Sequence, residues 1–191
     1  MSTNFKTYEN PSIFHRWAAA QWRRPKDPTI YGATEIDMEP ALAFVDKVRE
    51  EWGVNVTVTH LVAKALAIAI ARHPETNAKV RFWGKLEQRK TVDITVLIAG
   101  AGGRDLSAHP IIAMHGVDEA YAPLTPIGRI MVDALLTRIR PRPWVGEDGE
   151  LGVRPTLKLC ATFDHRVVDG VQAARLCQEL RTSLADPDSL R

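Results

Sequence analysis

The chain has 191 residues, of which 45% are hydrophobic and 25% charged, and its 25 basic against 23 acidic residues leave a formal net charge of +2. This composition is ordinary for a soluble globular domain with a sizeable core, and the near-neutral balance does not favour nucleic acid as a partner. No apolar run approaches the roughly 18 residues that span a bilayer, and the polar amino terminus lacks the apolar core of a signal peptide, so we expect a cytoplasmic protein without a membrane partner.

The first clear elements are a strand and a helix. Residues 29–36 have the composition of a strand, and Asp37 is placed to accept hydrogen bonds from the first turn of a helix over residues 38–52. Gly53 is suited to end that helix, because glycine adopts a left-handed conformation without strain. An apolar stripe gives the helix a side to bury: Leu42, Val45, Val48 and Trp52.

A second helix is predicted up to about Arg72, with Thr57 or Thr59 as its cap. This segment is apolar on most sides, which is typical of a buried helix. His60 and His73 lie at its two ends. We interpret both as capping or packing residues, because neither has neighbours with the spacing of a metal site.

Strand patterns follow in the middle of the chain. Residues 80–90 predict a hairpin in which Gly84 and Lys85 form a two-residue turn. Residues 91–99 predict a further strand, and the glycine-rich stretch 100–103 comes directly after it. Because no Gly-Lys-Ser/Thr sequence and no helix pattern follow these glycines, we interpret them as a flexible turn and not as a nucleotide site.

The last third of the chain ends in a strand and a helix. Residues 130–139 fit a helical period as well as a strand, so their spacing alone leaves both structures open. The apolar residues 154–163 predict a strand, and residues 171–184 predict a helix whose buried side has these members: Ala173, Ala174, Leu176, Cys177, Leu180 and Leu184. The apolar surroundings of Cys160 and Cys177 favour free thiols over a disulfide or a nucleophile.

The junction between that strand and that helix carries the residues with the clearest chemistry. His165 lies where the strand ends, and a histidine held there is suited to be a general base, because it titrates near neutral pH without help. Asp169 is placed to cap the helix, and Gly170 to allow a tight turn. The spacing by itself is also compatible with a surface turn and a capped helix without catalytic function.

The longer string over residues 163–170, Phe-Asp-His-Arg-Val-Val-Asp-Gly, resembles the active-site signature of the dihydrolipoamide acyltransferases, the core components of 2-oxoacid dehydrogenase complexes. Chloramphenicol acetyltransferase shares their fold and a looser form of the motif. The resemblance implies that His165 takes the proton from an attacking thiol or hydroxyl, with its tautomer fixed by its own backbone carbonyl. It also implies that Asp169 is structural and pairs with an arginine.

Other stretches resemble the family in the family's order. Residues 57–65 look like its buried helix, and residues 73–78, His-Pro-Glu-Thr-Asn-Ala, look like the phrase that follows that helix. In the family the arginine comes from the amino-terminal region, where the candidates are Arg16, Arg23 and Arg24. The resemblance favours a strand over residues 130–139. The Arg-rich residues 138–144 are open to two interpretations, a solvated strand end or a phosphate-binding patch for coenzyme A (CoA).

The interval between residues 91–99 and the motif departs from the family. Members usually carry there a phrase whose Ser or Thr donates a hydrogen bond to the tetrahedral oxyanion. Here only residues 100–127 fill the interval, and Pro110 or Ile111 falls near the hydroxyl position, where neither side chain can donate. Ser107 is the nearest upstream hydroxyl and the candidate donor, with a plain loop serine as the other interpretation. Losing one such donor costs roughly 10²–10³ in rate.

Mixed strands and helices, with hairpins late in the chain, predict an α/β two-layer sandwich with a mixed sheet, and the resemblance implies the chloramphenicol-acetyltransferase-like fold. We expect one catalytic-type domain over residues 1–191, with no lipoyl or subunit-binding domain and no metal. The resemblance implies an acyltransferase that moves an acyl group between CoA and either a dihydrolipoyl thiol on another protein or a small acceptor. It further implies homotrimers or cages of trimers, with other 2-oxoacid dehydrogenase components as partners.

The alternative function is a catalytically weak structural or assembly subunit of such a complex. The short middle interval and the missing hydroxyl favour this alternative. The intact His165, Asp169 and Gly170 favour the enzyme, because a chain free of catalytic demand has no obvious need for all three.

Overall fold

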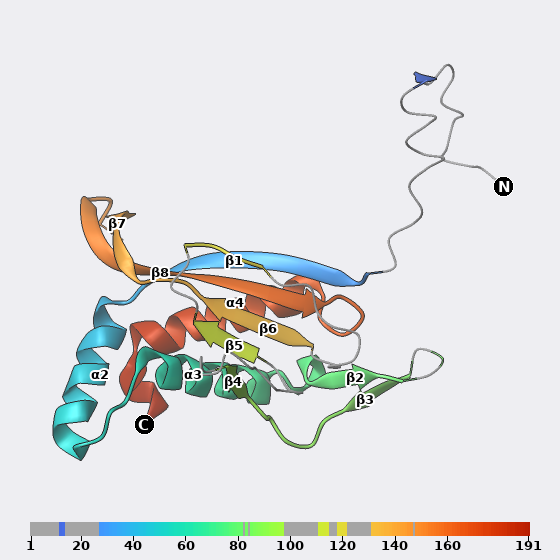
Figure 1. The fold of residues 1–191 in the computed structure, drawn as a ribbon, viewed down its shortest axis with the longest axis horizontal. Coiled ribbons are helices and arrows are strands. Elements are labelled where there is room, and N and C mark those ends of the chain that lie inside the picture. Colours follow the sequence, from blue (N-terminus) through green and yellow to red (C-terminus); the bar gives the residue numbers. More distant parts are fainter. Residues whose placement is uncertain are drawn as a thin grey trace, which may run out of the picture.

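A six-stranded mixed sheet carries helices on one face, which gives the molecule two layers (Figure 1). The computed structural model describes these residues: 12–13, 27–81, 83, 85–97, 111–114, 118–121, 131–146 and 148–191. Within them a second, two-stranded sheet lies at one side of the helical layer (Figure 1). This architecture confirms the predicted α/β sandwich with a mixed sheet.

The large sheet has the strand order β1-β8-β6-β5-β4, and β7 pairs with the first part of β8. Its strands are β1 (Thr29–Asp37), β4 (Thr95–Leu97), β5 (Ile111–Met114), β6 (Val132–Leu136), β7 (Arg140–Val145) and β8 (Leu151–Asp164). The small sheet consists of β2 (Ala78–Val80) and β3 (Leu86–Gln88). The helices are α2 (Glu39–Trp52), α3 (Val58–Arg72) and α4 (Gly170–Ala185), with short 3-10 turns η1 (Pro74–Thr76) and η3 (Pro187–Leu190).

Strand β8 organises the large sheet, because it pairs antiparallel with β1, β6 and β7. Alternate side chains of a strand share a face, and one face of β8 lies against the helices. The side chains on that face are all buried: Leu157, Leu159, Ala161 and Phe163. Their ladder partners on β6 are buried with them: Val132, Ala134 and Leu136. Residues 132–136 therefore form a strand, which confirms the structure that the family resemblance favours for residues 130–139.

Helix α2 ends as predicted but begins one residue later. Gly53 adopts a left-handed conformation with φ of 65° at its carboxyl end. The capping position is held by Met38, while Asp37 accepts a hydrogen bond from the Glu39 N–H at 2.9 Å. Trp52 was expected in the core, but it is 58% exposed, because the last turn of α2 borders an open pocket.

Helix α3 is buried between its neighbours α2 and α4, as its apolar composition predicts. Thr57 is the capping residue, and it forms a reciprocal capping box with His60, whose Nδ1 accepts from the Thr57 N–H at 3.1 Å. His73 occupies the carboxyl end of the helix. Both histidines are thus explained by the helix ends, as the sequence indicated.

Helix α4 follows the predicted bounds, but its buried side differs. The buried residues are Leu176, Leu180, Ser183 and Leu184, whereas Ala174 is exposed and Cys177 is half-buried. Leu176, Leu180 and Leu184 thus supply the apolar contact of α4, and Ala173 packs against the core only in part. Both cysteines are free, and burial raises the pKa of the Cys177 thiol, which keeps it protonated at neutral pH.

The predicted hairpin at residues 80–90 is present, although its register differs from the expected one. Val80 pairs with Leu86, and the Arg81 N–H donates to the Lys85 carbonyl at 2.7 Å, which a two-residue turn at Gly84 and Lys85 would not allow. The strand predicted at residues 91–99 is confined to Thr95–Leu97 in the described part of the chain.

Candidate active site

His165 lies in the turn between β8 and α4. The strand ends at Asp164, and α4 begins at Gly170, so the histidine occupies the strand–helix junction that the sequence predicted. Its backbone N–H donates to the Pro28 carbonyl at 2.8 Å, which ties the turn to the start of β1. The residue is exposed, so its imidazole is accessible from solvent.

One ring nitrogen of His165 is held by the backbone. Its Nδ1 lies 3.1 Å from the carbonyl oxygen of Val168. A carbonyl can only accept a hydrogen bond, so Nδ1 carries the proton in the neutral ring and Nε2 keeps its lone pair. The tautomer is therefore fixed by the Val168 carbonyl. The expectation that the histidine's own carbonyl does this was wrong, because the turn places the carbonyl of Val168, three residues later, next to Nδ1.

The residues on either side of His165 form an ion pair with each other. The Arg166 guanidinium donates to both carboxylate oxygens of Asp164, from Nε at 2.9 Å and from Nη2 at 2.7 Å. Hydrogen bonding to this carboxylate raises the pKa of the Arg166 guanidinium. Sequence reasoning missed this pair, although an acid and a base two positions apart in a predicted turn would have been a usable signal.

Asp169 caps α4, as its position predicted. Its carboxylate accepts from the Gln172 N–H at 2.8 Å, and the Gln172 side chain accepts from the Asp169 N–H at 2.8 Å. This is a reciprocal capping box. The candidate arginines for the partner of Asp169 lie outside the described residues: Arg16, Arg23 and Arg24.

Gly170 does not make the tight turn that was expected of it. It is the first residue of α4, and the positive φ values that favour glycine occur in the described chain at Gly53, Trp83 and Gly149. A Cβ added to Gly170 would meet no atom within 4 Å. The turn before α4 is closed by hydrogen bonds to Asp164, and for this reason it needs no left-handed residue at its end.

Strand β5 begins at the end of the sheet where His165 lies. Ile111 pairs with Asp133 on β6, and Asp133 pairs with Thr162 on β8, three positions before the histidine. With strands about 4.8 Å apart, Ile111 and Thr162 are separated by roughly 10 Å. Ser107 precedes Ile111 by four residues and lies outside the described chain.

Comparisons with known proteins identify the family and the fold. Residues 21–103 and 113–191 match the family described as 2-oxoacid dehydrogenases acyltransferase (catalytic domain). The chain belongs to this family. Residues 104–112 are outside the match. They contain Ser107, and also Pro110 and Ile111, which fall near the position of the family's hydroxyl.

Relatives in this family align with most of this chain. A chloroplastic dihydrolipoyllysine-residue acetyltransferase component 5 of the pyruvate dehydrogenase complex of Arabidopsis thaliana is 25% identical, over 85% of this chain and 42% of its own length. The chain thus spans about two-fifths of that relative. The dihydrolipoamide acetyltransferase of Azotobacter vinelandii has a TM-score of 0.72 at 21% identity, covering 92% of this chain and 86% of that one.

Two further solved structures establish the fold. The cubic core of a pyruvate dehydrogenase multienzyme complex has a TM-score of 0.72 at 20% identity, over 97% of this chain and 94% of that one. A chloramphenicol acetyltransferase has a TM-score of 0.53 at 13% identity, covering 83% of this chain and 86% of that one. The predicted chloramphenicol-acetyltransferase-like fold is confirmed.

The cap at Asp169 gives the family motif a measurable structural function. Replacing Asp169 with alanine removes the acceptor for the Gln172 N–H, and we expect the free energy of unfolding to fall by about 0.5–2 kcal/mol. Asp169→Asn keeps an acceptor oxygen and is the matched control. Chemical denaturation of the three proteins at one concentration measures the difference. Equal losses in both variants would contradict a capping function.

Two arginines of the Arg-rich stretch 138–144 have carboxylate partners: Arg140 with Asp118 and Arg142 with Glu35. Arg154 of the neighbouring strand β8 pairs with Glu39. The charges of Arg140 and Arg142 are already matched, so the geometry supports a solvated strand end. The alternative, a phosphate-binding patch for CoA, finds no support in these pairs.

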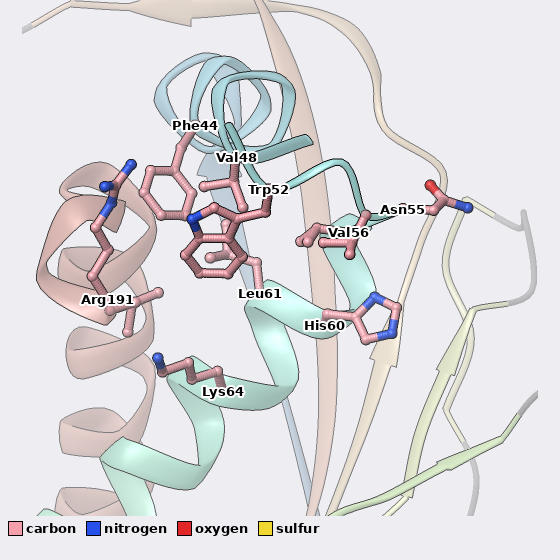
Figure 2. A pocket seen from close by; sticks show the side chains of 11 residues that line it. Phe44, Val48, Trp52, Asn55, Val56, His60, Leu61, Lys64 and Arg191 are labelled. Atoms are coloured by element: carbon pink, nitrogen blue, oxygen red, sulfur yellow. The ribbon is translucent and has the colours of Figure 1, made fainter. Parts of the chain in front are cut away.

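An apolar pocket lies at the other end of α4 from the motif. It has a volume of about 360 Å³ and lies between α2, the start of α3 and the last two residues, with Phe44, Trp52 and Leu61 around it (Figure 2). Since α4 has 16 residues with a rise of about 1.5 Å each, its two ends are roughly 24 Å apart. The pocket is therefore separate from His165.

In the described part of the chain, no group of three or more His, Cys, Asp or Glu side chains is arranged to hold a metal ion. None of the described helices has the length and apolar character required to cross a bilayer.

Proposed function

We propose that this chain is a CoA-dependent acyltransferase domain that moves an acyl group between CoA and a dihydrolipoyl thiol carried on another protein. The observation that carries the proposal is the orientation of His165. Its Nδ1 is hydrogen-bonded to the Val168 carbonyl, and the opposite nitrogen, Nε2, is left with a lone pair on an exposed ring. That is the state a general base needs before it takes a proton.

His165 performs two proton transfers in the proposed reaction. Nε2 takes the proton of the attacking thiol, and the resulting thiolate attacks the thioester carbonyl of the acyl donor. The imidazolium then returns the proton to the leaving sulfur as the tetrahedral intermediate collapses. The Val168 carbonyl stabilises the charged ring between the two steps through the Nδ1–H. CoA supplies the thioester or accepts the acyl group, according to the direction of transfer.

We propose Ser107 as the donor to the oxyanion. Two points support it: β5 begins at the sheet end that carries His165, and Ser107 precedes β5 by four residues. The Azotobacter acetyltransferase has been studied for the catalytic function of a serine, a histidine and an asparagine four positions after that histidine. Here Asp169 stands four positions after His165, where it caps α4, and we propose Arg16 or Arg24 as its charged partner.

We also propose that the chain assembles as a homotrimer or as a cage of trimers within a 2-oxoacid dehydrogenase complex. The cubic core of a pyruvate dehydrogenase complex, which shares the fold, supports this assembly. Light scattering on the purified chain tests it: a mass that is not a multiple of three chains of 21.3 kDa would contradict the trimer.

Acyl transfer is measured with the purified chain, a series of acyl-CoAs and free dihydrolipoamide. We expect S-acyl-dihydrolipoamide, detected by mass spectrometry, to form faster than without protein for at least one acyl group. Acetyl-CoA matches the acetyltransferases to which this chain is similar, and longer acyl-CoAs extend the series. If a folded chain gives no product above background with any of them, the assembly-subunit alternative, which the unmatched residues 104–112 favour, replaces the enzyme.

A further inference from the structure

The turn that carries His165 is built around the preceding residue, Asp164. This residue is only 7% exposed, and its carboxylate accepts three hydrogen bonds from Arg166 alone. The donors are the backbone N–H at 3.0 Å and the guanidinium Nε and Nη2 at 2.9 and 2.7 Å. A bidentate Arg–carboxylate contact fixes orientation as well as distance. The pair therefore holds the backbone on both sides of His165.

The backbone of Asp164 closes the same turn. Its carbonyl oxygen accepts from the N–H groups of Val167 and Val168, both at 2.9 Å, and its own N–H donates to the Met131 carbonyl at 3.0 Å. Val168 is fully buried, so its carbonyl has a fixed position relative to the core. That carbonyl is the group that accepts from His165 Nδ1.

We propose that Asp164 and Arg166 are positioning residues for His165, which hold residues 165–168 in the one conformation that presents the Val168 carbonyl to Nδ1. The pair touches neither nitrogen of the ring. It acts through the turn, whose shape decides which ring nitrogen carries the proton. The inference concerns the ring's tautomer, and only its kinetic consequence rests on the proposed acyl transfer.

A purely stabilising ion pair would leave a different signature. Loss of either partner would lower the melting temperature, yet the turn would still be closed by the backbone bonds to the Asp164 carbonyl, and the ring would keep its tautomer. A positioning pair predicts that the tautomer changes when the pair is weakened, because the peptide groups on either side of the ring are then free to rotate.

The test uses the full chain with two substitutions. Arg166→Lys keeps the charge but loses the two-pronged contact, and Asp164→Asn keeps the shape but loses one anionic oxygen. The matched control is Arg142→Lys, which weakens an Arg–carboxylate contact with Glu35 at the far end of the sheet. The protonated nitrogen of His165 is identified by 15N NMR of the imidazoles, with His165→Ala to assign its signals.

In the wild type and in Arg142→Lys we expect the Nδ1–H form of His165. In Arg166→Lys we expect a second population with Nε2–H, and kcat for acyl transfer about 10- to 100-fold lower with the KM for acyl-CoA within about twofold. Asp164→Asn is expected to behave alike. If one variant fails to fold, the other carries the test.

An unchanged tautomer in the folded variants would overturn the inference, as would an equal change in Arg142→Lys. The NMR measurement does not depend on turnover. A wild type that keeps the Nδ1–H form but transfers no acyl group would refute the proposed function alone and leave the positioning pair standing.

Discussion

Replacing His165 with alanine is expected to reduce kcat/KM for acyl transfer to dihydrolipoamide by about 10²–10⁴-fold. The substitution removes Nε2, the atom whose lone pair takes the thiol proton. The thiol then has to ionise without a base, and at neutral pH only a small fraction of it is thiolate. Because the ring is exposed and its N–H contact is with the Val168 carbonyl, the fold should tolerate the loss with little change in melting temperature.

The control for this experiment is another histidine of the described chain. His60→Ala removes the capping-box partner of Thr57 at the start of α3, which is remote from the motif. Its rate of acyl transfer should stay within about threefold of the wild type. A folded His165→Ala protein that keeps the wild-type rate of acyl transfer would contradict the general-base proposal and would favour the assembly function.

Replacing Leu159 with alanine is expected to lower the free energy of unfolding by about 2–5 kcal/mol. Leu159 is 2% exposed on the helix-facing side of β8, and its ladder neighbour on β6 is the fully buried Leu136. Removing the leucine leaves a cavity in the centre of the two layers, which close packing elsewhere prevents from collapsing. This is the largest effect we expect from one substitution on stability.

Leu151→Ala is the matched control for this measurement. It removes the same atoms from the same strand, but Leu151 is 75% exposed in the part of β8 that pairs only with β7. The expected change is within about 0.5 kcal/mol. Both variants are compared with the wild type by chemical denaturation at equal protein concentration, since assembly makes stability depend on concentration. Equal effects at both positions would contradict the placement of Leu159 in the core.

The strand, the helix and the cap around the motif were predictable because their signals are local. Apolar residues over 154–163 and a helical period over 171–184 belong to single elements, and a cap such as Asp169 acts on an N–H three residues away. Thr57 and Gly53 belong to the same class, since each acts within one turn of its own helix. Such features need no knowledge of the rest of the chain.

The amino-acid sequence by itself thus determined the elements, the family motif and the position of His165 at a strand–helix junction. Periodicity left residues 130–139 open and the family resemblance favoured a strand, and the tertiary structure confirms the strand at residues 132–136, where alternate side chains are buried between β5 and β8. Only the tertiary structure decided that the Val168 carbonyl, and not the histidine's own, holds Nδ1. Both depend on where segments meet in space, which periodicity along the chain does not encode.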